Sequence, residues 1–399
     1  MMILTRRMAA AVVAFFWAGA AFGQATRLEV SASPMVTDSA RSPSDNPAAQ
    51  PDDFVLQLQK RYYSLFQKAS PAVVQVNAAV SAAAGDTPYI WTGFFISKNG
   101  DILTTHADLL QAAEQTTKRV WVQYNRIGYP AEIKGYDLVS NLAVLHVTTP
   151  LPKDFAVLDL ADSPDVPAIG AMLFAVTSKE GQLPGPSMGL LQGYNVNFGE
   201  VQLATLHLRT NIPDDGGEGG SPVLDLQGRL VGIMIWSLKD SRSSLILPAR
   251  AALRVRDDLL TRGKVAYGRL GFASEQRSDA ESGVRVMVTS VDYGGPALDA
   301  GLKAGDVVRS LGTMAINNED DLRQAKFYLR PGQDVALSVR RGNEDIPLTL
   351  HIGEMPPDPA PILPTAASLP KPAAAVGSSN VVPGIPDPNM PPPPILKGK

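Results

Sequence analysis

The sequence predicts a protein built mainly from β-strands, and three observations support this fold class. Short runs of β-branched and aromatic residues alternate with turn signals between Val73 and Val147, a rhythm typical of small β-barrels rather than of βαβ units. A glycine-rich loop at residues 214–221 lies between two further β-type runs, residues 202–209 and 222–235. The chain has 399 residues, of which 45% are hydrophobic, so it has room for two or three domains.

The composition argues against several chemistries. A net charge of −3 argues against a general nucleic-acid-binding protein. Because the chain contains no cysteine, it can form no disulfide bond, thiolate metal site or cysteine nucleophile. We expect no cofactor and no metal, since the histidines show no paired spacing with carboxylates. An acidic cluster could hold a cation such as calcium, but its irregular spacing favours a solvated loop. This cluster consists of Asp214, Asp215, Glu218 and Asp225.

The N-terminal region predicts an exported protein. Residues 1–23 have the features of a secretory signal peptide, with Arg6-Arg7, an apolar run at residues 8–22 and a small residue at the cleavage site. The run is shorter than the roughly 20 residues of a spanning helix, and a retained anchor is the alternative. Residues 24–53 are rich in Ser, Ala, Pro and Asp, which predicts a disordered leader. We therefore expect a periplasmic or secreted protein.

Two segments predict helices. Apolar residues recur at helical spacing from Phe54 to Ala69, and Ser70-Pro71 ends the pattern. A second helical pattern covers residues 251–263, where Gly263 is a plausible stop.

Three motifs resemble those of the HtrA/DegP family of trypsin-like serine proteases. Residues 70–74 (SPAVV) match the family's Ser-Pro-Ala-Val-Val, and residues 91–104 are similar to its Gly-Ser-Gly-Phe-Ile-Ile-Ser and Gly-Tyr-Ile-Leu-Thr. The loop DDGGEGGSPVL at residues 214–224 resembles its nucleophile loop, Gly-Asn-Ser-Gly-Gly-Pro-Leu. The resemblance implies a chymotrypsin-like double β-barrel of two six-stranded barrels, which we place with the preceding helix in residues 54–262.

The nucleophile of the family is missing from its position. An ungapped alignment on Pro222 places the family's Ser on Gly219 and its second following glycine on Ser221. Ser221 is directly followed by proline and lacks the glycine pair that follows the family's nucleophile. We interpret Ser221 as a small residue in a glycine position, and a displaced nucleophile is the alternative.

The general base and the aspartate of the family also depart from the pattern. Counting from Thr104 places the base on Ala107, one residue after His106, whereas counting back from residues 112–114 places it on Asp108. His106 reaches the site only if the loop has shifted; otherwise we expect a partly exposed loop histidine. The catalytic aspartate position holds Asn141, and the same replacement lowers the turnover of a Ser-His-Asp protease by a factor of about 10⁴. Three departures together predict a barrel domain that has lost hydrolysis.

The backbone donors of the site survive these replacements. In the family, the oxyanion hole uses the N–H groups of the nucleophile and of the glycine two residues before it, which correspond here to Gly219 and Gly217. We hypothesise that these groups still bind a peptide carbonyl or carboxylate.

A second resemblance covers residues 266–354, which we predict to be a PDZ domain. Residues 267–272 (YGRLGF) resemble the carboxylate-binding loop of bacterial PDZ domains, and residues 295–308 (GPALDAGLKAGDVV) are close to a long motif of the same domains. PDZ domains bind C-terminal peptides by strand addition. The resemblance assigns the carboxylate loop to Leu270, Gly271 and Phe272, and the groove lining to Leu322 or Ala325. A spacer role for this domain is the alternative.

The C-terminal region predicts an extended tail. Residues 355–399 hold fourteen of the 33 prolines, a composition that favours a disordered, polyproline-like segment. We interpret it as a spacer or tether, with a docking ligand as the alternative.

Together these features predict a non-catalytic HtrA-like protein, a pseudoprotease that binds exposed or C-terminal peptide segments in the cell envelope as a chaperone, adaptor or scaffold. The alternative is a serine endopeptidase with a displaced site, in which Ser221 and His106 act together and Asn141 orients the base. A third interpretation is structural, since members of the family often form trimers and the helix at residues 54–69 could contribute to such an assembly.

Overall fold

The computed structural model confirms a mainly β protein. It describes residues 53–355, except for residues 81–86, 107–118, 153, 162, 164–165, 179–182, 199–200, 214–218, 239–241 and 280–282. The predicted signal peptide, residues 24–52 of the predicted leader and all but the first residue of the predicted tail lie outside the described residues, and Asp53, the last residue of the predicted leader, begins a helix. No helix of the described part is long and apolar enough to cross a membrane.

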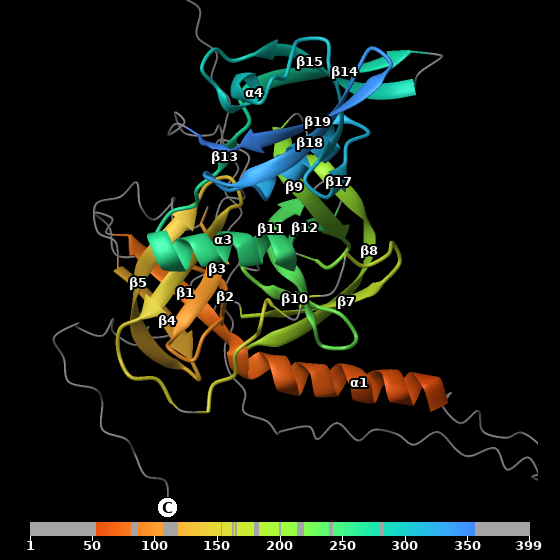
Figure 1. The fold of residues 1–399 in the computed structure, drawn as a ribbon. Coiled ribbons are helices and arrows are strands. Elements are labelled where there is room, and N and C mark those ends of the chain that lie inside the picture. Colours follow the sequence, from red (N-terminus) through yellow and green to blue (C-terminus); the bar gives the residue numbers. More distant parts are fainter. Residues whose placement is uncertain are drawn as a thin grey trace, which may run out of the picture. The chain divides into compact units, whose positions relative to one another are not determined.

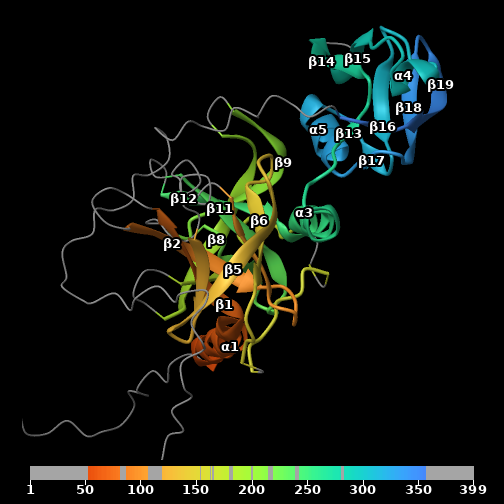
Figure 2. The same ribbon diagram turned by 90° about the vertical axis from the view of Figure 1, so that its left-hand side faces the viewer.

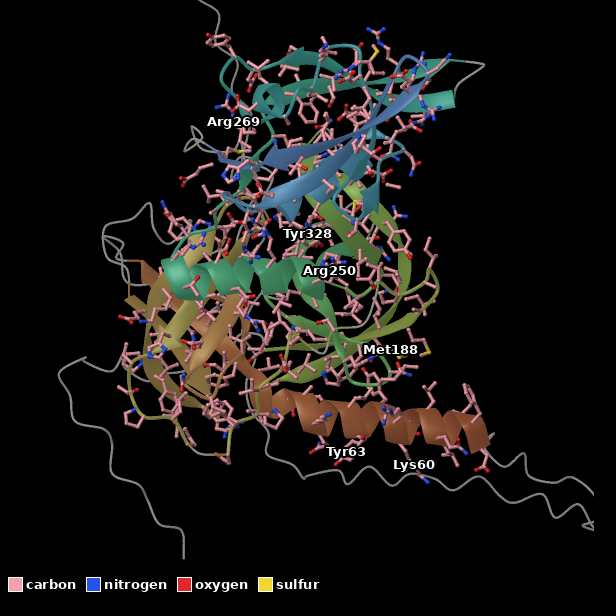
Figure 3. All side chains as sticks on the ribbon, in the orientation of Figure 1. Lys60, Tyr63, Met188, Arg250, Arg269 and Tyr328 are labelled. Carbon is pink, nitrogen blue, oxygen red and sulfur yellow. The ribbon has the colours of Figure 1, made fainter. Side chains whose placement is uncertain are left out.

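The first helix, α1 (Asp53–Ala69), forms where the helical spacing predicted it and leads into a 3-10 turn, η1 (Ser70–Ala72). Its C-terminal half is held by the second barrel: the Tyr62 ring meets the Phe174 ring edge to face, with centroids 4.9 Å apart, and Leu65 is buried. Its first turns are exposed, with Phe54 at 67%. Tyr63 and Lys60 project from the helix on the side away from the barrels (Figure 3).

The first closed barrel contains six strands in the order β1-β2-β3-β6-β5-β4 (Figure 1). They are β1 (Val73–Val80), β2 (Thr87–Phe95), β3 (Asp101–Thr105), β4 (Arg119–Tyr124), β5 (Ile127–Asp137) and β6 (Leu142–Val147). Antiparallel pairs join all neighbours, and alternate side chains turn inward as the period of a strand requires. Trp91, Phe95 and Ile102 lie in the buried core that results.

The second closed barrel has the order β10-β11-β12-β9-β8-β7. Its strands are β7 (Met172–Thr177), β8 (Gly185–Phe198), β9 (Val201–Thr210), β10 (Pro222–Leu224), β11 (Leu230–Leu238) and β12 (Ser243–Pro248). The two barrels therefore follow one another in the chain, as the resemblance implied. Residues 211–221 connect β9 to β10, so the glycine-rich loop joins two strands of the second barrel.

The helix α3 (Ala249–Arg262) packs against β5 and β6 of the first barrel and β11 and β12 of the second (Figures 1 and 2). It ends at Gly263, which adopts a left-handed conformation (φ +69°) and donates its N–H to the Leu259 carbonyl, as a glycine stop predicts. Residues of α3 and of both barrels share one buried apolar cluster.

The C-terminal part of the described chain forms a separate sheet with the order β14-β15-β16-β18-β19, in which β17 also pairs with β16 (Figure 2). The strands are β14 (Phe272–Asp279), β15 (Gly283–Val291), β16 (Val307–Leu311), β17 (Met314–Ala315), β18 (Asp334–Arg341) and β19 (Glu344–His351). A short pair, β13 (Gly268–Arg269) and β20 (Gly353–Glu354), and the helices α4 (Pro296–Asp299) and α5 (Glu319–Phe327) complete it. This sheet has its own apolar core.

Candidate functional site

The end of the glycine-rich loop lies at the seam between the two barrels, by which we mean Thr92, Thr104, His106 and Asn141 of the first barrel and Gly219–Ser221 and Ile235 of the second. Thr92 donates its N–H to the Gly219 carbonyl (3.1 Å), so β2 holds the loop from one side. On the other side, Gly220 donates its N–H to the Met234 carbonyl (2.8 Å), and Met234 donates its own to the Ser221 carbonyl (3.0 Å). Strands of both barrels therefore fix the loop where the resemblance places a nucleophile.

The backbone conformation and the close surroundings of residue 220 both require glycine at this position. The φ of Gly220 is +84°, in the left-handed region. A Cβ at this position would lie 2.1 Å from the Thr92 carbonyl oxygen and 2.9 Å from Thr104 Oγ1. The close approach of the two barrels thus depends on the absence of a side chain here.

A network of buried side chains reinforces the seam. Thr104 Oγ1 donates to the Thr92 carbonyl (2.7 Å) and accepts a hydrogen bond from Trp91 Nε1 (2.7 Å). Thr92 Oγ1 donates to the Ser178 carbonyl (3.3 Å) and accepts from the Ser178 N–H (3.0 Å). Sequence reasoning used Thr92 and Thr104 only as parts of strand motifs and did not identify them as anchors of the loop.

Ser221 is enclosed within the protein. Its exposed fraction is 0%, and its Oγ makes no hydrogen bond with any described residue. A nucleophilic serine needs access to substrate and a base within hydrogen-bond reach. In this conformation Ser221 has no such access.

His106 follows β3 and is also buried. Its N–H donates to the Asn141 carbonyl (3.0 Å), which continues the pairing of β3 with β6 by one residue. Its ring stacks on that of Tyr136 in β5, with centroids 4.2 Å apart and planes inclined by 22°. The expectation of a partly exposed loop histidine is wrong, because this stacking leaves only 3% of His106 exposed.

Asn141 uses its side chain to connect the two barrels. Its Nδ2 donates to the Ile235 carbonyl of β11 (3.2 Å), and the residue is 1% exposed. It lies in the left-handed region (φ +58°), which asparagine tolerates better than most residues. The preceding turn is fixed by Asp137, whose Oδ2 accepts from the Ser140 N–H (2.8 Å) and hydroxyl (2.6 Å). An ionised aspartate at position 141 would have no proton to donate to Ile235.

Of the two backbone donors that the sequence assigned to the site, only that of Gly219 lies within the described residues. No described backbone group accepts a hydrogen bond from the Gly219 N–H, although the Gly219 carbonyl is bound by Thr92. The other residues that sequence analysis assigned to the site, Gly217, Ala107 and Asp108, lie outside the described residues.

Each of the three remaining histidines lies within hydrogen-bond distance of a carboxylate or carbonyl oxygen of the fold. His146 Nδ1 lies 2.8 Å from Asp101 Oδ1, and His351 Nδ1 lies 2.8 Å from Asp334 Oδ1. His207 in β9 is buried, with Nδ1 2.8 Å from the Thr205 carbonyl and its ring stacked on Trp236. Among the described residues, no group of three or more His, Asp or Glu side chains could hold a metal ion.

We expect the buried His207 to make the folded protein less stable in acid. Burial lowers the pKa of His207 from 6.5 to about 4, so the folded state resists the proton that the unfolded chain binds. Stability should therefore fall as the pH drops from about 6.5 to 4, by about 2 kcal/mol at pH 5. Replacement His207→Leu should reduce the loss between pH 7.5 and pH 5 by about this amount in urea unfolding followed by circular dichroism. The variant His351→Leu, at an exposed histidine, should leave the loss unchanged; equal behaviour of both variants would contradict the prediction.

Of the acidic cluster, only Asp225 is described, and its carboxylate is engaged locally. Its Oδ1 accepts from the N–H groups of Gln227 and Arg229 (both 2.9 Å), and its Oδ2 pairs with the Arg229 side chain (2.8 Å). Asp225 thus closes the turn between β10 and β11.

A second candidate site lies in the C-terminal sheet, at the turn that precedes β14. Gly271 has φ +81°, and a Cβ there would approach Pro296 Cδ to 2.9 Å. Its carbonyl accepts from the Asp292 N–H (2.9 Å), and Asp292 Oδ2 pairs with Arg269 (2.7 Å), which is labelled in Figure 3. No described backbone group accepts from the N–H of Leu270 or Gly271. A carboxylate receptor of this kind uses the backbone N–H groups of such a turn as donors.

This turn opens onto the edge of the sheet. Within the described residues, β14 pairs only with β15, so its other edge is unpaired and faces α5. Leu270, Leu322 and Ala325 are buried in the apolar core beside it. The structure thus brings together all the peptide-binding residues that the sequence predicted, with Phe272 at the start of the edge strand. An unpaired edge next to a helix can accept an extended peptide as a further strand.

Comparisons with protein families identify a peptidase domain and a PDZ domain. Residues 91–233 match the trypsin-like peptidase domain, and residues 268–352 match the PDZ domain. A trypsin-like double barrel followed by a PDZ domain is the class of protein that the fold defines. The chain thus has the domains of a trypsin-like peptidase that carries a PDZ domain, and its relatives and structural neighbours bear HtrA and DegP-like names.

Curated relatives share about a quarter of their residues with the chain. HhoB of Synechocystis sp., which carries a serine protease name, is 23% identical over 73% of this chain and 79% of its own length. A "Probable periplasmic serine endoprotease DegP-like" of Halomonas elongata is 27% identical over 66% of this chain. A protein of the same name from Hahella chejuensis is 27% identical over 67% of this chain. The chain covers 56% and 57% of these two DegP-like relatives.

Solved structures support the same fold. The HtrA-type protease AlgW with a decapeptide has a TM-score of 0.59 and 21% identity, with 74% of this chain and 99% of that chain covered. The serine endoprotease from Yersinia pestis has a TM-score of 0.52 and 21% identity, with 74% and 98% covered.

Proposed function

We propose that this protein is a non-catalytic member of the HtrA family that binds exposed or C-terminal peptide segments in the cell envelope, as a chaperone, adaptor or scaffold. The observation that carries the proposal is the hydrogen bond from Asn141 Nδ2 to the Ile235 carbonyl. A group that orients a catalytic imidazole must accept from it and stabilise its charge. At this position the amide nitrogen donates across the seam, which an ionised carboxylate cannot do.

The other two positions of the site support the proposal. Gly219 has no side chain at the nucleophile position, and the alternative nucleophile Ser221 is buried without a hydrogen-bond partner for its Oγ among the described residues. The alternative base His106 is covered by Tyr136. In contrast, the PDZ turn, its N–H groups and the unpaired edge of β14 are compatible with peptide binding. The HtrA-type protease AlgW, whose fold is similar, was solved with a decapeptide.

The alternative is a serine endopeptidase that uses Ser221 and His106, and the serine endoprotease names of the relatives favour it. This alternative requires the seam to open, so that a substrate can reach Ser221 and the His106 ring no longer stacks on Tyr136. The periplasmic names of the DegP-like relatives support the envelope location under either function.

Cleavage and binding assays separate the two functions. The purified chain without residues 1–23 should not cleave unfolded casein, and Ser221→Ala should behave identically, while an active DegP-like protease serves as the positive control. The same protein should bind fluorescent peptides with a free carboxyl terminus at least about tenfold more tightly than the same peptides with an amidated terminus. If the parent protein cleaved casein and the replacement Ser221→Ala abolished this cleavage, the protein would be an endopeptidase and the proposal would be contradicted.

A further inference from the structure

One face of α5 carries both the apolar lining of the groove and a carboxylate. Glu319 lies three residues before Leu322, and Leu322 lies three residues before Ala325, so the members of each pair are neighbours on the surface of the helix. Leu322 and Ala325 are buried beside the edge strand β14. Glu319 therefore continues the groove face by one turn, at the end of α5 that lies farthest from Ala325.

The opposite wall of the groove, strand β14, contacts the helix at Glu319. Gln276 lies on β14, four residues after Phe272, and its Oε1 accepts a hydrogen bond from the Glu319 N–H (3.2 Å). Strand and helix are thus joined by a side chain at this end of the groove. A peptide whose carboxylate sits at the turn of residues 270–272 would run antiparallel to β14 and pass Gln276 and Glu319 with its upstream residues.

Glu319 has unused hydrogen-bonding capacity at this point. Its Oε1 is shielded from solvent and has no hydrogen-bond partner among the described residues. The neighbouring carboxylates are occupied: Asp320 pairs with Arg323, and Asp321 accepts from the Asn317 N–H and Nδ2. The nearby cation on β14, Arg277, pairs with Glu275. A shielded carboxylate oxygen without a donor is costly, so a ligand that supplies a charged donor gains affinity.

We propose that Glu319, together with Gln276, makes the PDZ groove selective for peptides that carry a lysine or arginine three or four residues before an apolar C-terminal residue. The range follows from Gln276, which lies four residues along β14 from Phe272, with a register shift between Ala273 and Ser274 that alters the count by one. The proposal rests on the proposed function, because it concerns the same groove. A purely structural role of Glu319, as a negative charge in the first turn of a helix, would affect stability but not peptide selectivity.

The test measures binding of labelled decapeptides to the full chain by fluorescence anisotropy. The peptides share a free C-terminal leucine on a neutral sequence and carry lysine or acetyl-lysine in turn at each of the five positions before it. Peptides with lysine three or four residues before the terminus should bind about fivefold more tightly than peptides with acetyl-lysine at the same position, whereas lysine directly before the terminus should bring no gain. In Glu319→Gln this ratio should fall to about one, with unchanged affinity for the acetyl-lysine peptides.

The matched control is Glu344→Gln, which removes the same charge from an exposed residue of β19, the strand at the opposite edge of the sheet. It should retain the fivefold ratio. A ratio near one in the parent, or an equal ratio in parent and Glu319→Gln, would overturn the proposal. If no free-carboxylate peptide binds better than its amide, the proposed function itself fails, which is a different outcome from a loss of selectivity.

Discussion

Replacement of Gly220 by alanine should destabilise the barrels by about 3–5 kcal/mol. Two causes add. The left-handed φ of +84° is unfavourable for alanine, and the new Cβ would lie 2.1 Å from the Thr92 carbonyl oxygen, which belongs to a backbone fixed by several hydrogen bonds. The seam must therefore open for the methyl group to fit.

Urea unfolding followed by tryptophan fluorescence measures this effect on the barrels, because the tryptophans Trp91, Trp121 and Trp236 lie in barrel strands and the PDZ region contains none. The matched control is Gly170→Ala, at a φ of +89° with nothing within 4 Å of the new Cβ. This control should lose only about 1 kcal/mol, which is the cost of the left-handed conformation. If Gly220→Ala lost as little stability as the control, the contacts at the seam would have to rearrange at little energetic cost.

The replacement Asn141→Asp, which restores the residue type of the family, should destabilise the barrels by about 3 kcal/mol at pH 7 and should not produce protease activity. The carboxylate would face the Ile235 carbonyl, which now accepts from Asn141 Nδ2, and would be buried at a position that is 1% exposed. The loss should shrink as the pH falls toward 4, because the protonated acid can donate to Ile235. Addition of Gly219→Ser should still give no cleavage of casein.

Asn211→Asp provides the control, because Asn211 uses its Oδ1 to accept from the Leu190 N–H (2.6 Å) and aspartate preserves that acceptor. It should change stability by less than about 1 kcal/mol. If Asn141→Asp were as stable as the parent, or if it cleaved casein, the structural role of Asn141 would be refuted.

Local motifs were sufficient to predict the fold. The two β-rich regions, the helix of residues 54–69 and the long PDZ motif each depend on patterns within a few tens of residues, and the barrels and the PDZ sheet confirm them. The domain boundaries, the signal peptide and the role of the tail stay predictions. The site was harder to predict, since counting from motifs placed the base on residues that the structure does not describe.

The properties that distinguish this site arise from contacts between distant residues. Asn141 and Ile235 are 94 residues apart, so the sequence revealed the loss of an aspartate but not the new use of the amide. The stacking of His106 on Tyr136 likewise depends on the pairing of β3, β5 and β6, and a pattern of single residues does not contain it. The contact of Gln276 with Glu319 joins residues 43 positions apart, and neither residue belongs to a recognisable motif.

The bonds across the seam have a consequence for how the protein unfolds. Thr92 of the first barrel is hydrogen-bonded to both Gly219 and Ser178 of the second, Asn141 to Ile235, and α3 packs on strands of both barrels. Separating the barrels would expose these groups and the cluster that they share. We therefore expect the two barrels to unfold as a single cooperative unit, in which neither barrel keeps its structure after the other is lost.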